Sequence, residues 1–293
     1  MSSTAFTPRQ EPSLPSAWAH AYLEMRRHPH REMSPFAVTV EAPAGLSLAA
    51  TLADPLVQAL DACLDQDGHQ TVEKVAFTIF PERTWLLCGG ERHELYRESM
   101  RNLRTFATWE PRKNLGAMYF VRLIGFGIDH KTGESLGYEP TKALAADGNQ
   151  LEHIIRQCGK SVERGRKVPR MQLQAAVFDP FRDLTTSGQP SFPCLQHVAF
   201  DPDLEAGGLA LTAFYATQQL YVKGYGNWLG LCRLGAFVAG QASLKLTRFT
   251  CFVGVEKMDK APKSGALHNE LLRRVREIAG LAPAAERVVA AHA

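Results

Sequence analysis

The sequence lacks the features that mark membrane and secreted proteins. No apolar run approaches the roughly 20 residues that a bilayer-spanning helix needs, and Arg233 interrupts the most apolar stretch, residues 229–240. The first residues, MSSTAFTPRQEPSLPSAW, contain no apolar segment of the kind found in signal peptides. We therefore expect a cytoplasmic protein that does not associate with a membrane.

The sequence also lacks cysteine pairs and metal-ligand spacings. Its six cysteines form no CxxC motif and no zinc-like pattern with histidine; they are Cys63, Cys88, Cys158, Cys194, Cys232 and Cys251. His28 and His30 flank a proline without further ligands nearby, so we expect no metal site. Free thiols in a reducing compartment are the simplest interpretation.

Strong charge of one sign is absent too. The net charge of +3 is too small to indicate a nucleic-acid partner by itself. Basic residues nevertheless gather in the segment GKSVERGRKVPR, which holds Lys160, Arg164, Arg166, Lys167 and Arg170. Such a loop is either a solvated surface or a binding site for phosphate or a longer polyanion.

The length of 293 residues, with 45% hydrophobic and 22% charged residues, suits a globular enzyme. Residues 1–35 are rich in proline, serine and charge, which predicts a flexible or surface-draped arm. We expect residues 36–293 to form a single α+β domain, with a large mixed β-sheet covered by helices.

Hydrophobic periodicity predicts the elements of this domain. We expect strands over residues 36–42, 72–80, 171–179, 194–202, 208–222 and 244–258. We expect helices over residues 54–66, 91–108, 149–158, 229–242 and 267–279, and a strand or short helix over 116–127. Asp54 and Pro55 are typical of a helix N-cap and first turn.

Four segments between residues 149 and 259 carry an ordered set of motifs: NQLEHII, Arg170, Phe192-Pro193-Cys194 followed by Phe200, and GLALTAFYATQQLYVKGYGNWLGLCRL. They resemble, in order, the DQL helix, the RRI strand, the PPCH nucleophile motif and the QRS strand–loop–helix of the thymidylate synthase family. The segment LGAMYFVR, residues 115–122, resembles a further family motif, GPVYGxxWR.

The resemblance implies a thymidylate synthase-like fold and a particular chemistry. Cys194 would add to C6 of a pyrimidine, so that C5 can attack the one-carbon unit of 5,10-methylenetetrahydrofolate. Arg170 would lower the pKa of the thiol and contact a substrate phosphate. Asn227 would read O4 and N3–H of uracil, because an amide both donates and accepts. Tyr119 would organise water for proton transfer at C5.

The resemblance also implies partners and further contacts. Gln196, Gln219 and Tyr225 complete the substrate-binding set. Family members are homodimers whose sheets pack back to back, and the basic loop of one subunit reaches the other subunit's site. We therefore expect a homodimer that binds a pyrimidine nucleotide or nucleoside.

Several positions depart from the family pattern. Leu195 follows the nucleophile where the family has histidine, and Ala216 and Met171 stand where two phosphate-binding arginines would be. Gln219 replaces the folate-orienting aspartate, and the residues at the sugar-binding positions are Lys257 and Asp259. Losing guanidinium contacts removes a strong phosphate anchor.

These departures favour one reading and leave another open. The first is a methyl- or hydroxymethyltransferase acting at C5 of a non-standard uracil nucleotide or nucleoside. The alternative is a non-catalytic, dimeric relative that binds a nucleotide or a nucleic acid.

Overall fold

A mixed β-sheet organises the computed structural model, which describes residues 9–109, 118–129, 132–139, 141–142, 144–145, 147–184, 186, 192–258, 261–262 and 264–281. Within these residues one seven-stranded sheet has the order β1-β3-β7-β6-β5-β4, and β2 also pairs with β7. The strands are β1 Arg9–Glu11, β2 Glu32–Met33, β3 Phe36–Glu41, β4 Gln174–Ala176, β5 Leu195–Asp203, β6 Gly208–Gln219 and β7 Lys245–Lys257. β6 and β7 pair in parallel, whereas β5 and β6 pair in antiparallel orientation.

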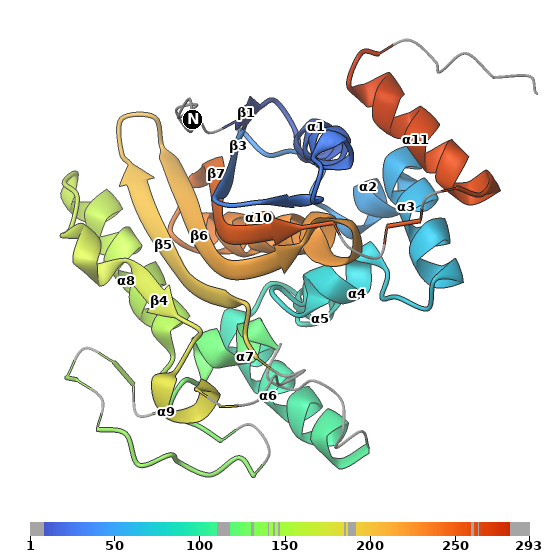
Figure 1. Ribbon diagram of the computed structural model, residues 1–293. Coiled ribbons are helices and arrows are strands. Elements are labelled where there is room, and N and C mark those ends of the chain that lie inside the picture. The colour runs from blue at the N-terminus through green and yellow to red at the C-terminus, as the bar shows by residue number, and fades with distance from the viewer. Residues whose placement is uncertain are drawn as a thin grey trace, which may run out of the picture.

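The helices are α1 Leu14–Arg27, α2 Leu48–Ala53, α3 Pro55–Gln66, α4 Val72–Phe77, α5 Glu82–Leu87, α6 Arg92–Trp109, α7 Tyr119–Ile124, α8 Gln150–Arg164, α9 Pro180–Asp183, α10 Tyr225–Gln241 and α11 Ala266–Ile278. The long helix α10 packs on β6 and β7, and α1, α4 and α8 pack around it (Figure 1). The predicted α+β class, with a large mixed sheet covered by helices, is confirmed.

Close packing of α10 on α4 corrects one element. A Cβ atom on Gly226 would lie 2.6 Å from Val75 Cβ, and one on Gly230 would lie 2.8 Å from the Ala76 carbonyl oxygen. The prediction of a strand over residues 72–80 is therefore wrong: α4 is a helix that fits against these two glycines. Its buried apolar residues, Val72, Val75 and Ala76, follow helical spacing, and Ile79 just after the helix continues it.

Arg233, which interrupts the apolar stretch, is buried, and its guanidinium group is paired with hydrogen-bond acceptors. Arg233 forms a two-pronged ion pair with Glu73, at 2.7 and 2.9 Å, and donates to the Leu46 carbonyl at 2.6 Å. Two bonds in a fork suit a guanidinium group. They tie α10 to α4 and to the segment before α2.

The first helix corrects the prediction of an N-terminal arm. Ser13 caps α1 through its side chain, and Trp18, Tyr22 and Met25 are completely buried. The indole N–H of Trp18 donates to the Leu220 carbonyl at 3.1 Å. Residues 14–27 thus belong to the hydrophobic core, because their apolar side chains recur on one helix face. Residues 1–8 lie outside the described residues.

Other elements match the prediction with shifted ends. The strand expected over residues 171–179 is reduced to β4, and Arg170 lies before it in the 3₁₀ turn η2, Arg170–Gln172. The strand expected over 208–222 ends at Gln219, where the chain turns into the π-helical segment η3, Leu220–Gly224. The segment 116–127 contains the short helix α7; residues 116 and 117 lie outside the described residues.

None of the helices in the described ranges is long and apolar enough to cross a membrane.

The burial of α1 predicts a large stability effect. Replacing Trp18 by alanine should lower the free energy of unfolding by about 3–5 kcal/mol, because a large core side chain and its hydrogen bond are both lost. Urea unfolding followed by circular dichroism measures this change. Arg27→Ala, on the exposed side of the same helix, is the control and should change the value by less than about 0.5 kcal/mol. Equal effects of the two substitutions would contradict the packing described.

Candidate active site around Cys194

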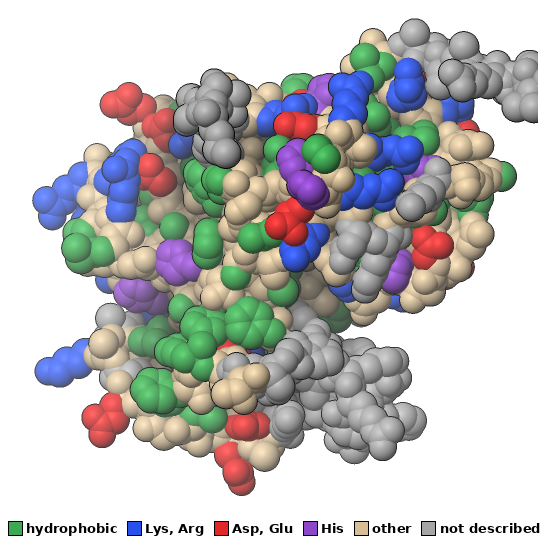
Figure 2. All heavy atoms as spheres, viewed as in Figure 1, with side chains coloured by type: hydrophobic (Ala, Val, Ile, Leu, Met, Phe, Trp, Pro, Cys, Tyr) green, Lys and Arg blue, Asp and Glu red, His purple; other side chains and the backbone are tan. Residues whose placement is uncertain are grey.

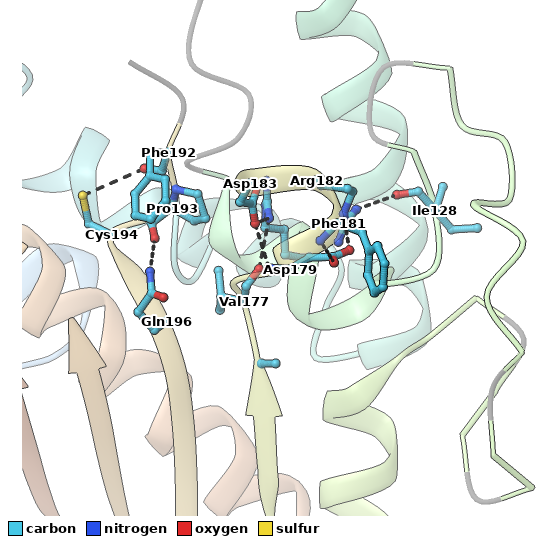
Figure 3. Close-up of polar contacts among 12 residues, drawn as sticks. Ile128, Val177, Asp179, Phe181, Arg182, Asp183, Phe192, Pro193, Cys194 and Gln196 are labelled. Atoms are coloured by element: carbon cyan, nitrogen blue, oxygen red, sulfur yellow. Dashed lines mark hydrogen bonds and ion pairs between the residues drawn. The ribbon is translucent and has the colours of Figure 1, made fainter. Parts of the chain in front are cut away.

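Cys194 lies directly before β5, where the strand enters the sheet (Figure 3). Its side chain is half-buried, and its Sγ lies 3.9 Å from the Phe192 carbonyl oxygen. The neighbouring strand fixes its backbone, because the Ala216 N–H donates to the Cys194 carbonyl at 3.1 Å. A partly accessible thiol on a rigid strand end is a suitable place for a nucleophile.

The structure brings Tyr119 to Cys194, as the sequence predicts. Tyr119 begins α7 and is 7% exposed. Burial raises the pKa of its hydroxyl above the ordinary tyrosine range, and the nearby backbone N–H groups of Leu195 and Cys194 act in the opposite direction. The Tyr119 side chain is therefore a neutral hydroxyl held beside the strand start.

A lysine that the sequence reasoning missed supplies positive charge near the thiol. Burial raises the pKa of the Cys194 thiol above its ordinary value, and the Lys223 ammonium acts in the opposite direction. Lys223 belongs to η3 and contacts the Gln70 side chain. Its only sequence signal is a single cation inside the apolar QQLYVKGYGNW segment.

Arg170 does not lie beside Cys194 within the chain, which corrects that expectation. It forms a two-pronged ion pair with Asp201, with both N–O distances 3.0 Å, and its side chain is 70% exposed. Asp201 stands near the far end of β5, seven residues from Cys194, or roughly 20 Å of extended strand. The arginine therefore does not lower the thiol pKa in its own chain.

The remaining predicted site residues occupy different settings. Gln196 donates to the Pro193 carbonyl at 2.6 Å and so braces the turn before β5 (Figure 3). Gln219 is half-buried at the end of β6. Tyr225 is 5% exposed and packs edge-on against Trp18, which is a core contact.

Asn227 lies in the first turn of α10, one turn after Lys223. It is 6% exposed, and its side-chain amide makes no hydrogen bond within the described part of the chain. Asn227 follows β6 in the chain, and β6 is also the strand that holds the Cys194 backbone through the Ala216 N–H.

The structure also shows the exposure or the partners of most positions that depart from the family motifs. Met171 is 76% exposed in η2, and Leu195 is completely buried. Lys257 pairs with Glu32 at 3.3 Å. Asp259 lies outside the described residues.

A buried ion pair supports the helix that carries Tyr119. Arg122 in α7 bonds both oxygens of Asp183 in α9, at 2.7 and 2.8 Å, and donates to the Val177 carbonyl at 3.0 Å. Asp183 lies beside Asp179 and Arg182 in Figure 3. The pair fixes α7 to the end of β4, although neither residue was singled out from the sequence.

Within the described ranges no group of three or more His, Cys, Asp or Glu side chains could hold a metal ion. No known protein-family model matches the chain, and no curated protein matches its sequence.

The surroundings of Cys194 predict its reactivity. Iodoacetamide should label Cys194 before the four buried cysteines, Cys63, Cys158, Cys232 and Cys251. Because burial raises the pKa of the Cys194 thiol, its labelling rate should keep rising above pH 8.5, where an ordinary thiol is about half ionised. Lys223→Gln should slow labelling about two- to tenfold at neutral pH, because it removes the nearby cation.

Peptide mapping by mass spectrometry identifies the labelled residue. Cys88 is the other half-buried cysteine, so Cys88→Ser is the matched control and should leave the Cys194 rate unchanged. Preferential labelling of Cys88 would contradict the assignment.

Proposed function

We propose that the chain is a thymidylate synthase-like transferase that adds a methyl or hydroxymethyl group to C5 of a uracil nucleotide or nucleoside. The observation that supports this most directly is the placement of Cys194 beside the Tyr119 hydroxyl and near the Lys223 ammonium. A thiol, a hydroxyl and a cation are the groups that addition to C6 and proton transfer at C5 require.

Each residue has a distinct role in this proposal. The Cys194 thiolate forms the bond to C6, and Lys223 favours the thiolate because its ammonium group opposes the desolvation of the anion. Tyr119 keeps its proton and can hold a water near C5. Asn227 offers a free amide that can pair with O4 and N3–H of uracil.

The co-substrate in this proposal is 5,10-methylenetetrahydrofolate, which supplies the one-carbon unit when bound. Gln219 keeps hydrogen-bonding capacity at the position of the folate-orienting carboxylate, but it lacks the charge. Its place at the end of β6, next to Lys257 on β7, leaves its amide partly exposed. The residues present therefore fit a neutral hydrogen bond to the folate ring.

The cations of the chain favour a substrate with little negative charge. Lys223 is the cation found near Cys194 among the described residues, because Arg170 is held by Asp201. One ammonium group suits a nucleoside or a nucleotide with a single phosphate better than a substrate that needs several guanidinium contacts.

We also propose that the protein is a homodimer that joins through the open face of the sheet. Phe214 of β6 and Phe252 of β7 are directly paired in register, and they are 46% and 39% exposed. The helices that contact β6 and β7 lie on the opposite face (Figure 1). Adjacent exposed phenylalanines at the centre of a sheet are typical of a surface that is covered in solution.

The free state of the six cysteines supports our proposal of a cytoplasmic protein, where thiols stay reduced.

A second candidate function is a non-catalytic module that binds nucleic acid. Lysine and arginine side chains gather over the end of α8, at the left of Figure 2. Lys160, Arg164 and Arg166 are exposed there and have no acidic partner among the described residues. Such a group fits a phosphate backbone.

A tritium-release assay tests the enzyme proposal. The protein with methylenetetrahydrofolate should release tritium from C5 of at least one uracil nucleoside or nucleotide. Cys194→Ser should lower the rate about a thousandfold or more, because the nucleophile is lost and the change is nearly isosteric. Asn227→Asp should shift preference towards cytosine compounds by about tenfold or more. Binding of nucleic acid without any release would support the non-catalytic module instead.

Analytical ultracentrifugation tests the homodimer. The protein should sediment as a dimer at micromolar concentration, and Phe252→Asp should weaken association at least tenfold by placing a charge in the apolar interface. Leu87→Asp, at a position that is 88% exposed on α5, is the matched control and should leave the dimer intact. A monomeric wild-type protein would overturn this part of the proposal.

A further inference from the structure

The last described helix, α11, packs against α1 and α3, and a histidine lies in this contact (Figure 1). His268 of α11 is 2% exposed, and Leu271 and Val275, which follow it at helical spacing, are completely buried. Side chains three and four positions apart lie on the same side of a helix, so these residues form one buried face. His268 is therefore an interior residue of the contact between the helices.

The hydrogen bond of His268 determines its protonation state. Arg26 Nη1 of α1 lies 2.5 Å from His268 Nε2. A guanidinium group has N–H donors and no acceptor, so Nε2 is the acceptor and carries no proton. The ring proton is then on Nδ1, which is buried and has no hydrogen-bond partner among the described residues. This geometry holds His268 as a neutral imidazole.

Two guanidinium groups and one carboxylate act on the His268 ring. Burial lowers the pKa of His268 below its ordinary range, and Arg26 of α1 and Arg31, which follows α1, lower it further. Asp67, which follows α3, acts in the opposite direction, but its carboxylate also accepts from the Tyr221 hydroxyl at 2.9 Å. The charges around the ring thus oppose a further positive charge.

Two other titratable side chains near this contact stay neutral. They are Tyr22 of α1 and Cys63 of α3, which act on Arg26 and Tyr221 respectively. Burial raises the pKa of Tyr22 to about 12 and raises the pKa of the Cys63 thiol. Neither group changes charge between neutral and mildly acidic pH, so His268 is the group that titrates there.

The ion pairs of α11 lie within the helix itself. Arg273 and Arg274 both pair with Glu270, at 2.7 and 2.8 Å. These pairs stabilise the helix but do not join it to α1 or α3. The contact with α1 and α3 thus depends on other groups, among them the apolar face and the Arg26–His268 hydrogen bond.

We propose that His268 is an acid-sensitive switch, whose protonation breaks the hydrogen bond with Arg26 and releases α11 from α1 and α3. A proton from the solvent adds to Nε2 and takes the lone pair that accepts from Arg26 in the neutral state. The product is an imidazolium ring that faces a guanidinium group in a buried contact, where like charges repel strongly. Movement of α11 gives the new charge access to water. The residues of this switch lie outside the Cys194 site, so the inference does not depend on the proposed function.

Hydrogen exchange followed by mass spectrometry tests the release of α11. Between pH 7.5 and pH 5, the protection factors of the α11 amides should fall about tenfold, because the released histidine binds a proton that the docked histidine excludes. At pH 5 the α11 amides should also exchange before those of α10, which distinguishes release of one helix from global unfolding.

His268→Gln is the decisive variant. The glutamine side-chain oxygen can accept from Arg26 as Nε2 does, but it does not bind a proton in this pH range. The α11 protection factors of the variant should therefore differ less than twofold between pH 7.5 and pH 5. His30→Gln, at an exposed histidine, is the matched control and should keep the wild-type pH dependence.

Arg26→Gln keeps the test sharp if His268→Gln fails to dock α11 at any pH. This variant retains an N–H donor for Nε2 but removes the positive charge, so His268 protonates with less opposition. The loss of protection between pH 7.5 and pH 5 should then shrink to about two- to fivefold. A loss as large as in the wild type would overturn the role of Arg26.

Stability against pH gives a second readout. A histidine whose pKa is lowered in the folded state contributes stability that is present above its unfolded pKa of about 6.5 and is lost as pH falls through the folded-state pKa. The free energy of unfolding of the wild type should therefore fall more steeply below about pH 6.5 than that of His268→Gln.

Three results would overturn the inference. The first is unchanged α11 protection in the wild type at pH 5, and the second is an equal loss of protection in the wild type and in His268→Gln. The third is equal protection of α11 and α10 at pH 5, which would show that acid unfolds the whole domain instead of releasing one helix.

Discussion

The close approach of β6 and β7 at Gly254 is the constraint on which the site depends. A Cβ atom on Gly254 would lie 2.7 Å from the Ala216 carbonyl oxygen, so a side chain would push the two parallel strands apart. At this level the strands change which residues face inward, and Gln218 and Glu256 turn towards α10. Beyond it, β6 continues into η3 and then α10, which carry Lys223 and Asn227. Ala216 also donates its N–H to the Cys194 carbonyl, so the same position of β6 contacts both Gly254 and the residue proposed as the nucleophile.

Buried ion pairs join helices in the polar interior. Arg233 with Glu73 and Arg122 with Asp183 are two-pronged ion pairs that join helices, and their hydrogen bonds offset the cost of burying charge. Among the described residues the side-chain oxygens of Glu256 and Tyr215 have no such partners. An uncharged carboxylic acid costs much less to bury than a carboxylate, which explains how the fold accommodates Glu256 without a counter-ion.

The charged groups near Cys194 are the basis for the kind of substrate that we propose. The resemblance to thymidylate synthases suggested an arginine beside the thiol, but Arg170 is bound to Asp201 at the other end of β5. Lys223 takes the position of the nearby cation, and an ammonium group provides charge without the planar fork that grips phosphate. In the proposed function this cation, with Asn227 in the first turn of α10, would suit recognition of a base more than of a highly charged phosphate tail.

Short-range signals in the sequence determined most element ends, whereas the tertiary structure decided which way residues face. Asp54 caps α3 as predicted, because a cap involves only the next three residues, and Asn149 caps α8 in the same way. The strand after Cys194 and the helix containing Arg233 follow from local periodicity. The same reasoning made residues 72–80 a strand and residues 1–35 an arm, because their apolar side chains reveal their helical role only against α10 and the core. Strict alternation from Val253 places Glu256 on the outer face, whereas the structure buries it two residues after Gly254, whose backbone approaches β6 too closely for a side chain.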